Sequence, residues 1–127
     1  MKRFIVFLVS LCIYVNIYSQ ARIGSSLDEI KNEFTNNDMR YSIIEKIPCL
    51  IVIYSNVDVF YYLNNAGFCY QTSIVTKNLT LAKNIIDIYN KNYIIKSRIS
   101  WIMNNNFRIV TIQFQYITGI GYIFTWK

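Results

Sequence analysis

The last third of the sequence alternates between apolar and polar side chains with a period of two. Three stretches carry the pattern, Tyr93–Met103, Phe107–Tyr116 and Ile120–Trp126, and they are separated by Asn104-Asn105-Asn106 and by Thr118-Gly119. Successive side chains of a strand point to opposite faces, so the pattern predicts three antiparallel strands with one face buried and one face exposed to solvent. The apolar set is Ile95, Ile99, Trp101, Val110, Ile112, Phe114, Tyr116, Tyr122, Phe124 and Trp126; the polar set is Lys96, Arg98, Ser100, Thr111, Gln113, Gln115, Thr125 and Lys127.

A second group of strands is expected between Tyr41 and Lys77. The apolar stretches are Ile43–Ile47, Leu50–Tyr54, Val57–Leu63 and Phe68–Val75, and they are separated by Pro48, by Ser55-Asn56 and by Asn64-Asn65-Ala66-Gly67. The last of these separators indicates a hairpin, because Gly67 tolerates a positive φ. This part of the chain therefore predicts an antiparallel meander.

Two amphipathic helices are expected, one before each group of strands. Ser26 and Glu29 have the spacing of a capping box, and the apolar stripe that follows predicts a helix from about Leu27 to Phe34. A second helix is expected to begin near Asn78 or Thr80, both of which are capping residue types. Its apolar stripe consists of Leu79, Ala82, Ile86, Tyr89 and Tyr93, widened by Ile85 and Ile88.

These elements predict a single α+β domain over residues 22–127. Its expected order is α-β-β-β(-β)-α-β-β-β, with two short amphipathic helices packed on one face of an antiparallel sheet. A helix followed by an antiparallel meander occurs twice, without a convincing residue-level repeat. The chain is 54% hydrophobic and contains one proline and four glycines, which excludes disordered and collagen-like classes.

The first 21 residues have the three parts of a secretory signal peptide. Lys2 and Arg3 precede an uncharged apolar run, and Ser19-Gln20-Ala21 fits cleavage after Ala21. We therefore expect an exported protein, periplasmic or secreted, whose processed chain has no transmembrane segment. An uncleaved membrane anchor is the alternative, although no basic stop-transfer cluster follows. Cys12 follows Leu11, which does not fit the small residue of a lipobox.

Charge is distributed unevenly along the chain. The net charge of +6 becomes +4 once residues 1–21 are removed, with eleven basic and seven acidic residues remaining. Residues 22–76 carry four basic and six acidic groups, whereas residues 77–127 carry seven basic groups and one acidic group. The candidate binding face is formed by Lys96, Arg98, Gln113, Gln115 and Lys127. It suits an anionic envelope component or an envelope protein, and ordinary solubilisation of an open sheet face explains the same residues.

The sequence offers little for catalysis. It contains no histidine, which removes histidine-based triads and the commonest metal ligand. No catalytic residue, metal site or cofactor is predicted, and no pair of carboxylates is placed by the sequence to act as acid and base. Export and the inward phase of most aromatic residues argue against nucleic acid as a partner.

Cys49 and Cys69 are the two cysteines of the processed chain, and export favours a disulfide. In a meander one strand would lie between them, which places them roughly 9.5 Å apart, beyond the reach of a bridge. Two buried thiols are the alternative.

Several segments resemble known exported proteins. A leader ending in Tyr18-Ser19-Gln20, then Ile23-Gly24-Ser25-Ser26, and Ile88–Ile95 leading to Trp101 together resemble small uncharacterised exported proteins of Bacteroidota. The opening Gly-Ser motif also resembles that of outer-membrane-assembly lipoproteins and β-lactamase-inhibitor-like domains. That second resemblance implies a short helix packed on an antiparallel sheet.

Together these features favour a non-enzymatic binding or interaction module of the cell envelope. The alternative is a small hydrolase that uses carboxylates or a serine. A lesser alternative is a protein anchored by its uncleaved N-terminal segment.

Overall fold

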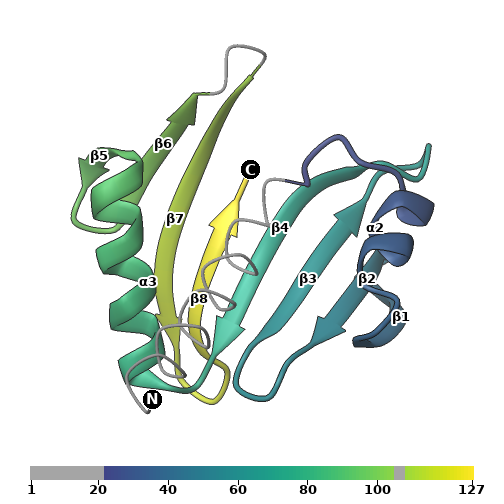
Figure 1. Ribbon diagram of the computed structural model, residues 1–127, viewed down its shortest axis with the longest axis horizontal. Coiled ribbons are helices and arrows are strands. Elements are labelled where there is room, and N and C mark those ends of the chain that lie inside the picture. Colours follow the sequence, from purple (N-terminus) through teal and green to yellow (C-terminus); the bar gives the residue numbers. More distant parts are fainter. Residues whose placement is uncertain (1–21, 105–107) are drawn as a thin grey trace, which may run out of the picture.

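The computed structural model describes residues 22–104 and 108–127. The predicted signal peptide and the predicted turn residues Asn105 and Asn106, together with Phe107, lie outside the described residues. The remainder forms one antiparallel sheet of eight strands with two helices (Figure 1). The elements are α2 (Leu27–Glu33), β1 (Asp38–Ile44), β2 (Ile47–Ile53), β3 (Asp58–Leu63), β4 (Cys69–Thr76), α3 (Leu79–Asn92), β5 (Ile94–Ser97), β6 (Ser100–Asn104), β7 (Ile109–Ile117) and β8 (Gly121–Trp126).

The sheet consists of two four-stranded meanders joined through their last strands. Its order is β1-β2-β3-β4-β8-β7-β6-β5, and the junction runs from Thr72 opposite Trp126 to Thr76 opposite Tyr122. Each meander follows a helix, so a helix and four strands occur twice and the second set is arranged in reverse order across the sheet (Figure 1). The antiparallel sheet and the two helices agree with the sequence-based expectation.

Helix α2 begins at the predicted capping box. The Ser26 hydroxyl accepts from the Glu29 amide at 3.2 Å, and the Glu29 carboxylate accepts from the Ser26 amide at 3.3 Å. The start of the helix is tied to the β3–β4 hairpin, because the Leu27 amide donates to the Gly67 carbonyl at 3.0 Å. Ile30 is fully buried beneath the helix.

Helix α3 is capped by Asn78, whose side-chain oxygen accepts from the Leu81 amide at 3.0 Å. Its buried residues are Ala82, Ile85, Ile88 and Tyr89. Leu79, which the sequence pattern places in the stripe, is 49% exposed. The buried stripe is therefore centred on Ile85 and Tyr89 rather than on the line through Leu79 and Ile86.

The first hairpin turns at a different place from the one predicted. Glu45 and Lys46 have φ angles of 50° and 70° and form the turn, while Pro48 lies within β2 opposite Ile43. A two-residue hairpin with positive φ at both central positions matches the twist of the strands it joins. The prediction that Pro48 separates two strands was wrong because β2 starts before it.

The segment Tyr93–Met103 is a hairpin rather than the single strand that was predicted. Strands β5 and β6 are joined by Arg98 and Ile99, and the Ser97 and Ser100 hydroxyls are 2.7 Å apart across the turn. The Ile99 amide donates to the Ser97 hydroxyl at 3.3 Å, a local bond that competes with continued strand pairing. This adds one strand to the predicted order, which becomes α followed by four strands, twice.

The core contains two apolar clusters, one beneath each helix. The cluster of α3 combines Ile85 and Tyr89 with Trp101, Phe124 and Trp126. The cluster of α2 consists of Ile30, Phe34, Leu50, Val52, Val59, Tyr61, Leu63 and Cys69. Both clusters use the same alternate positions of the strands, because pairings link Leu50, Tyr61, Thr72, Trp126, Ile112 and Trp101 in one row.

Candidate functional site

The candidate site lies on the sheet face opposite that row of core residues, and we call it the outer face. Residues opposite one another in an antiparallel sheet point to the same side. The pairings place Ile51, Phe60, Ser73, Thr125, Gln113 and Ser100 in a single row across six strands. The outer row therefore runs across both meanders, with Ser73 and Ser100 buried within it.

The half of the outer face on β7 and β8 is polar at its centre, with Ile109 and Ile117 at the two ends of β7, and we call it the polar half. Thr111, Gln113, Thr125 and Lys127 line a shallow hollow of about 210 Å³. Lys127 is held beside β7 by two backbone hydrogen bonds of 3.0 Å with Thr111. Gln115 lies two residues after Gln113 on β7, opposite Ile123, and therefore points to the same face. Three of the five predicted binding residues, Gln113, Gln115 and Lys127, thus share this exposed surface.

The other two predicted binding residues lie outside the regular strands. The register shifts between Ile95 and Ser97, so Lys96 occupies a bulge, and Arg98 belongs to the turn that follows. Strand alternation therefore does not decide which way these two side chains point. Both are exposed, near Ser97 and Ser100 at one end of the outer row.

The half of the outer face on β2 and β3 is apolar and aromatic, which the sequence reasoning missed. Phe60 and Tyr62 stack with ring centroids 6.4 Å apart and an interplanar angle of 17°. Both are half-buried, as is Ile51 beside Phe60. Burial, followed by the nearby Cys49, raises the pKa of the Tyr62 hydroxyl. The sequence does carry a signal for this surface. The four consecutive residues from Val59 to Tyr62 are all apolar or aromatic, so both faces of β3 carry such side chains.

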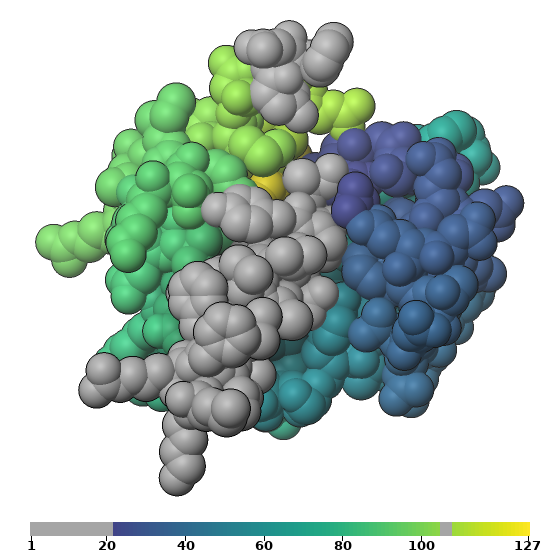
Figure 2. All heavy atoms as spheres, in the orientation of Figure 1, coloured from purple at the N-terminus to yellow at the C-terminus, as the bar shows by residue number. Residues whose placement is uncertain are grey.

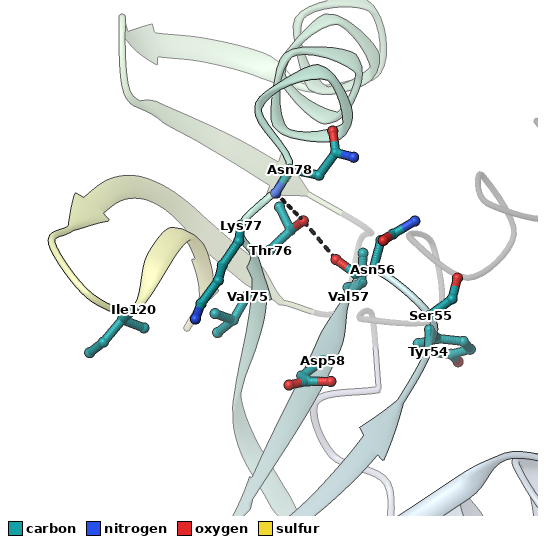
Figure 3. Close-up of a pocket in the computed structure, with 10 residues that line it drawn as sticks. All are labelled: Tyr54, Ser55, Asn56, Val57, Asp58, Val75, Thr76, Lys77, Asn78 and Ile120. Carbon is teal, nitrogen blue, oxygen red and sulfur yellow. Dashed lines mark hydrogen bonds between the residues drawn. The ribbon is translucent and has the colours of Figure 1, made fainter.

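A separate pocket of about 270 Å³ lies where β3 begins and β4 ends (Figure 3). The Thr76 hydroxyl donates to the Asn56 carbonyl at 2.7 Å and accepts from the Asn78 amide at 3.1 Å. These two bonds hold the loop after β2 against the start of α3. Asp58 and Lys77 flank Val75 at this pocket (Figure 3). The pocket therefore offers one carboxylate and one ammonium group at the rim of the outer face.

Three carboxylates outside α2, those of Glu45, Asp58 and Asp87, lie in separate places. Glu45 is in the β1–β2 turn, whereas Asp58 pairs with Ile53 at the opposite end of β2. The seven residues of β2 separate them by about 20 Å. Asp87 belongs to α3 and is exposed. Glu45 and Asp58 are thus too far apart to act as an acid and base pair.

Cys49 and Cys69 are free and buried, and they occupy different surroundings. Cys49 lies opposite Tyr62, whereas the Cys69 thiol is 3.5 Å from the Thr72 hydroxyl within the α2 cluster. β3 separates the strands that carry them, as the sequence argument assumed. Burial, followed by the charge of Cys69, raises the pKa of Cys49 to about 12, and burial also raises that of Cys69.

Comparison with known proteins returns no match, whether against family models, curated proteins or solved structures. Within residues 22–104 and 108–127, neither helix has the length and apolar character needed to cross a membrane.

Proposed function

We propose that the chain is an exported, non-enzymatic binding module of the cell envelope that contacts its partner through the outer face. The observation that supports this most directly is the unbroken outer row, which joins an aromatic surface at Phe60 to a polar surface at Gln113. Aromatic residues are enriched at protein interfaces, and apolar surface rimmed by polar residues marks interaction sites.

The arrangement of the helices supports this use of the sheet. The strand residues of both core clusters lie in parallel rows on one face of the sheet. Figure 1 draws both helices in front of the sheet, and their atoms lie at the front of Figure 2, which has the same orientation. We infer that both helices cover the same face. On the other face, the described helices leave the outer row available to a partner across six strands.

The distribution of charge indicates what kind of partner fits. Residues 77–127 carry seven basic groups and one acidic group. Of the basic groups, Lys127 lies on the polar half of the outer face, and Lys96 and Arg98 lie near one end of its row. A basic exported domain attracts anionic lipid, acidic polysaccharide or an acidic surface of an envelope protein. The exposed amides of Gln113 and Gln115 can donate hydrogen bonds to such acceptors.

The test is capture of partners from an envelope extract, analysed by mass spectrometry and compared between matched variants. Gln113→Glu with Gln115→Glu places two negative charges on the outer face. Lys83→Gln with Asn84→Asp makes the same change of net charge on exposed positions of α3. The proposal expects a partner retained by the wild type and the helix variant and lost by the outer-face variant. Equal retention by all three proteins would contradict it.

Direct binding separates the classes of partner. The same three proteins are mixed with phosphatidylglycerol vesicles, with phosphatidylcholine vesicles and with an acidic polysaccharide. If the partner is an anionic envelope component, the wild type should bind the phosphatidylglycerol vesicles or the acidic polysaccharide but not the phosphatidylcholine vesicles. This binding should weaken with added salt and should be weaker for the outer-face variant. An envelope protein as partner predicts capture from the extract without binding to any of these probes.

Export is a part of the proposal that intact mass tests on its own. Processing after Ala21 predicts that the exported protein begins at or next to Arg22. Detection of Met1 in the purified product would instead support the membrane-anchored alternative. Glu45 and Asp87 lie away from the outer row, in the β1–β2 turn and on α3. Glu45→Gln with Asp87→Asn should therefore leave binding intact, whereas a hydrolase that depends on these carboxylates would lose its activity.

A further inference from the structure

The two edges of the sheet differ in how well they are protected against pairing. Strand β5 has four residues, and its register with β6 is broken at Lys96. A short strand, a bulge and a lysine are common devices that keep an edge from pairing with another chain. Strand β1 has seven residues and pairs with β2 in an unbroken register from Asp38 to Ile44. The β1 edge therefore offers a regular ladder of backbone groups.

Strand β1 also exposes a row of large apolar side chains beside that ladder. Met39, Tyr41 and Ile43 lie opposite Val52, Leu50 and Pro48, and so share one face of the sheet. Their exposed fractions are 36%, 51% and 65%. Arg40 is the one basic residue of this strand, and its charge lies between the apolar side chains in the sequence. Exposed apolar residues along an edge strand of regular register indicate a surface that another strand covers.

We propose that the β1 edge binds the β1 edge of a second copy of this chain, in an antiparallel pairing with its two-fold axis at Tyr41. This register pairs all seven residues of the strand, because Tyr41 is its central residue. Met39 then faces Ile43 of the second copy, and Tyr41 faces Tyr41 of the second copy. The apolar row of each chain completes that of the other, which is the self-complementarity that an isologous interface requires.

Neighbouring registers fit less well. An axis at Arg40 places two arginines directly opposite each other and pairs only five residues, and like charges in that position destabilise a sheet. An axis at Ser42 also pairs five residues. With the axis at Tyr41, Arg40 faces Ser42 of the second copy and Asp38 faces Ile44 of the second copy. No charged residue then faces one of the same sign.

Charge favours contact between two β1 edges over contact between two β5 edges. Residues 22–76 carry four basic and six acidic groups, so the halves that meet at β1 are close to neutral. Residues 77–127 carry a net charge of +6, which opposes contact at β5. The chain already joins its own two meanders by antiparallel pairing of β4 with β8. A β1 pair would extend the sheet in the same manner.

Molecular mass in solution tests the proposal, measured by light scattering during gel filtration over a dilution series. The expected mass of the purified protein is twice that of one chain. Tyr41→Lys and Ile43→Lys place a charge in the proposed contact and should each raise the dimer dissociation constant roughly tenfold or more. Ile95→Lys makes the same change at an exposed position of the other edge strand and should leave the mass unchanged. Thermal unfolding of each variant monitors its folding.

Crosslinking tests the register. Opposed residues of antiparallel strands have Cα atoms about 4.5 to 5.5 Å apart, a separation that a disulfide spans. Tyr41→Cys chains should therefore crosslink on mild oxidation, whereas wild-type and Ile95→Cys chains should not. A mixture of Met39→Cys and Ile43→Cys chains should form more crosslinked dimer than a solution of either variant by itself. A monomer at every concentration, an assembly larger than a dimer, or crosslinking at Ile95→Cys in place of Tyr41→Cys would overturn the proposal.

Discussion

Trp126 donates a hydrogen bond from its indole nitrogen to the hydroxyl of Tyr89, with 3.1 Å between the two atoms. The bond links the last residue of β8 to the last turn of α3, and both side chains are fully buried. The two rings also meet edge to face, with centroids 5.6 Å apart and an interplanar angle of 82°. Tyr89 makes similar edge contacts with Trp101, Phe124 and Tyr93. It therefore joins the helix to the second meander through both aromatic packing and a polar contact.

Tyr89→Phe should lower the free energy of unfolding by about 1–3 kcal/mol. The substitution keeps the ring in place but leaves the buried indole N–H of Trp126 without its acceptor. Urea unfolding followed by tryptophan fluorescence measures the change. Tyr116→Phe removes the same atom from a side chain that is 58% exposed, so its effect should stay within about 0.5 kcal/mol. Equal losses for both variants would mean that the bond contributes nothing.

Ser26→Ala should destabilise the protein by about 0.5–2 kcal/mol, because it removes the acceptor for the Glu29 amide at the start of α2. The loss should be partly shared with Glu29→Ala, since the two side chains act reciprocally in one capping box. Urea unfolding of both single variants and the double variant measures the coupling. Ser55→Ala, on an exposed loop, is the matched control. Strictly additive losses would contradict reciprocal capping.

The helices and most strands could be predicted because their signals are local. The capping box at Ser26 and the alternation of β7 and β8 depend on residues close together in the sequence. The turns at Glu45-Lys46 and at Arg98-Ile99 could not be predicted in the same way. Neither contains glycine or asparagine, and both depend on which strand pairs with which. Hydrophobic periodicity does not specify that pairing.

Gly121 is the position where a glycine is most strictly required. Its φ is +123°, and a Cβ atom there would lie 2.6 Å from the carbonyl oxygen of Thr76, where β8 meets β4. Gly119 has a φ of +85°, and its Cβ would meet nothing within 4 Å. Gly121→Ala should therefore cost clearly more than Gly119→Ala, whose cost is about 1–2 kcal/mol of backbone strain. Comparable melting temperatures for the two variants would contradict this account of the β4–β8 junction.

The candidate site was predictable in its polar half only. Gln113 and Gln115 stand on a strand whose alternation is regular, so their shared face follows from the sequence. The aromatic half at Phe60 and Tyr62 was not found, because apolar residues on both sides of β3 match a buried strand as well as a half-covered one. Only the pairing of β4 with β8 brings the two halves onto one surface.

Both thiols of the folded chain should resist alkylation at pH 8, because Cys49 and Cys69 are buried and their pKa values are raised. In urea without a reductant, both should react rapidly, and the mass should increase by two labels for these residues. A disulfide would block both labels until a reductant is added. The wild-type masses with and without reductant therefore distinguish free thiols from a bridge.

The stability of the protein should fall as the pH rises from about 9 towards 12, and Cys49 should be one cause. Burial, together with the nearby Cys69, raises the pKa of Cys49 from 9.0 to about 12. Below pH 9 the thiol is protonated in both states and the full stability is present. Between pH 9 and 12 the unfolded thiol loses its proton while the folded one keeps it, so the free energy of unfolding falls by up to about 1.4 kcal/mol per pH unit.

Urea unfolding of the wild type and of Cys49→Ala, at pH 8, 9, 10 and 11 with reductant present, measures this effect. The difference in free energy of unfolding between the two proteins should shrink as the pH rises. Tyr54, whose pKa burial and Glu33 raise to about 12, adds its own decline above pH 10 in both proteins and cancels in the comparison. A difference that stays constant over this range would show that the folded environment of Cys49 does not disfavour its thiolate.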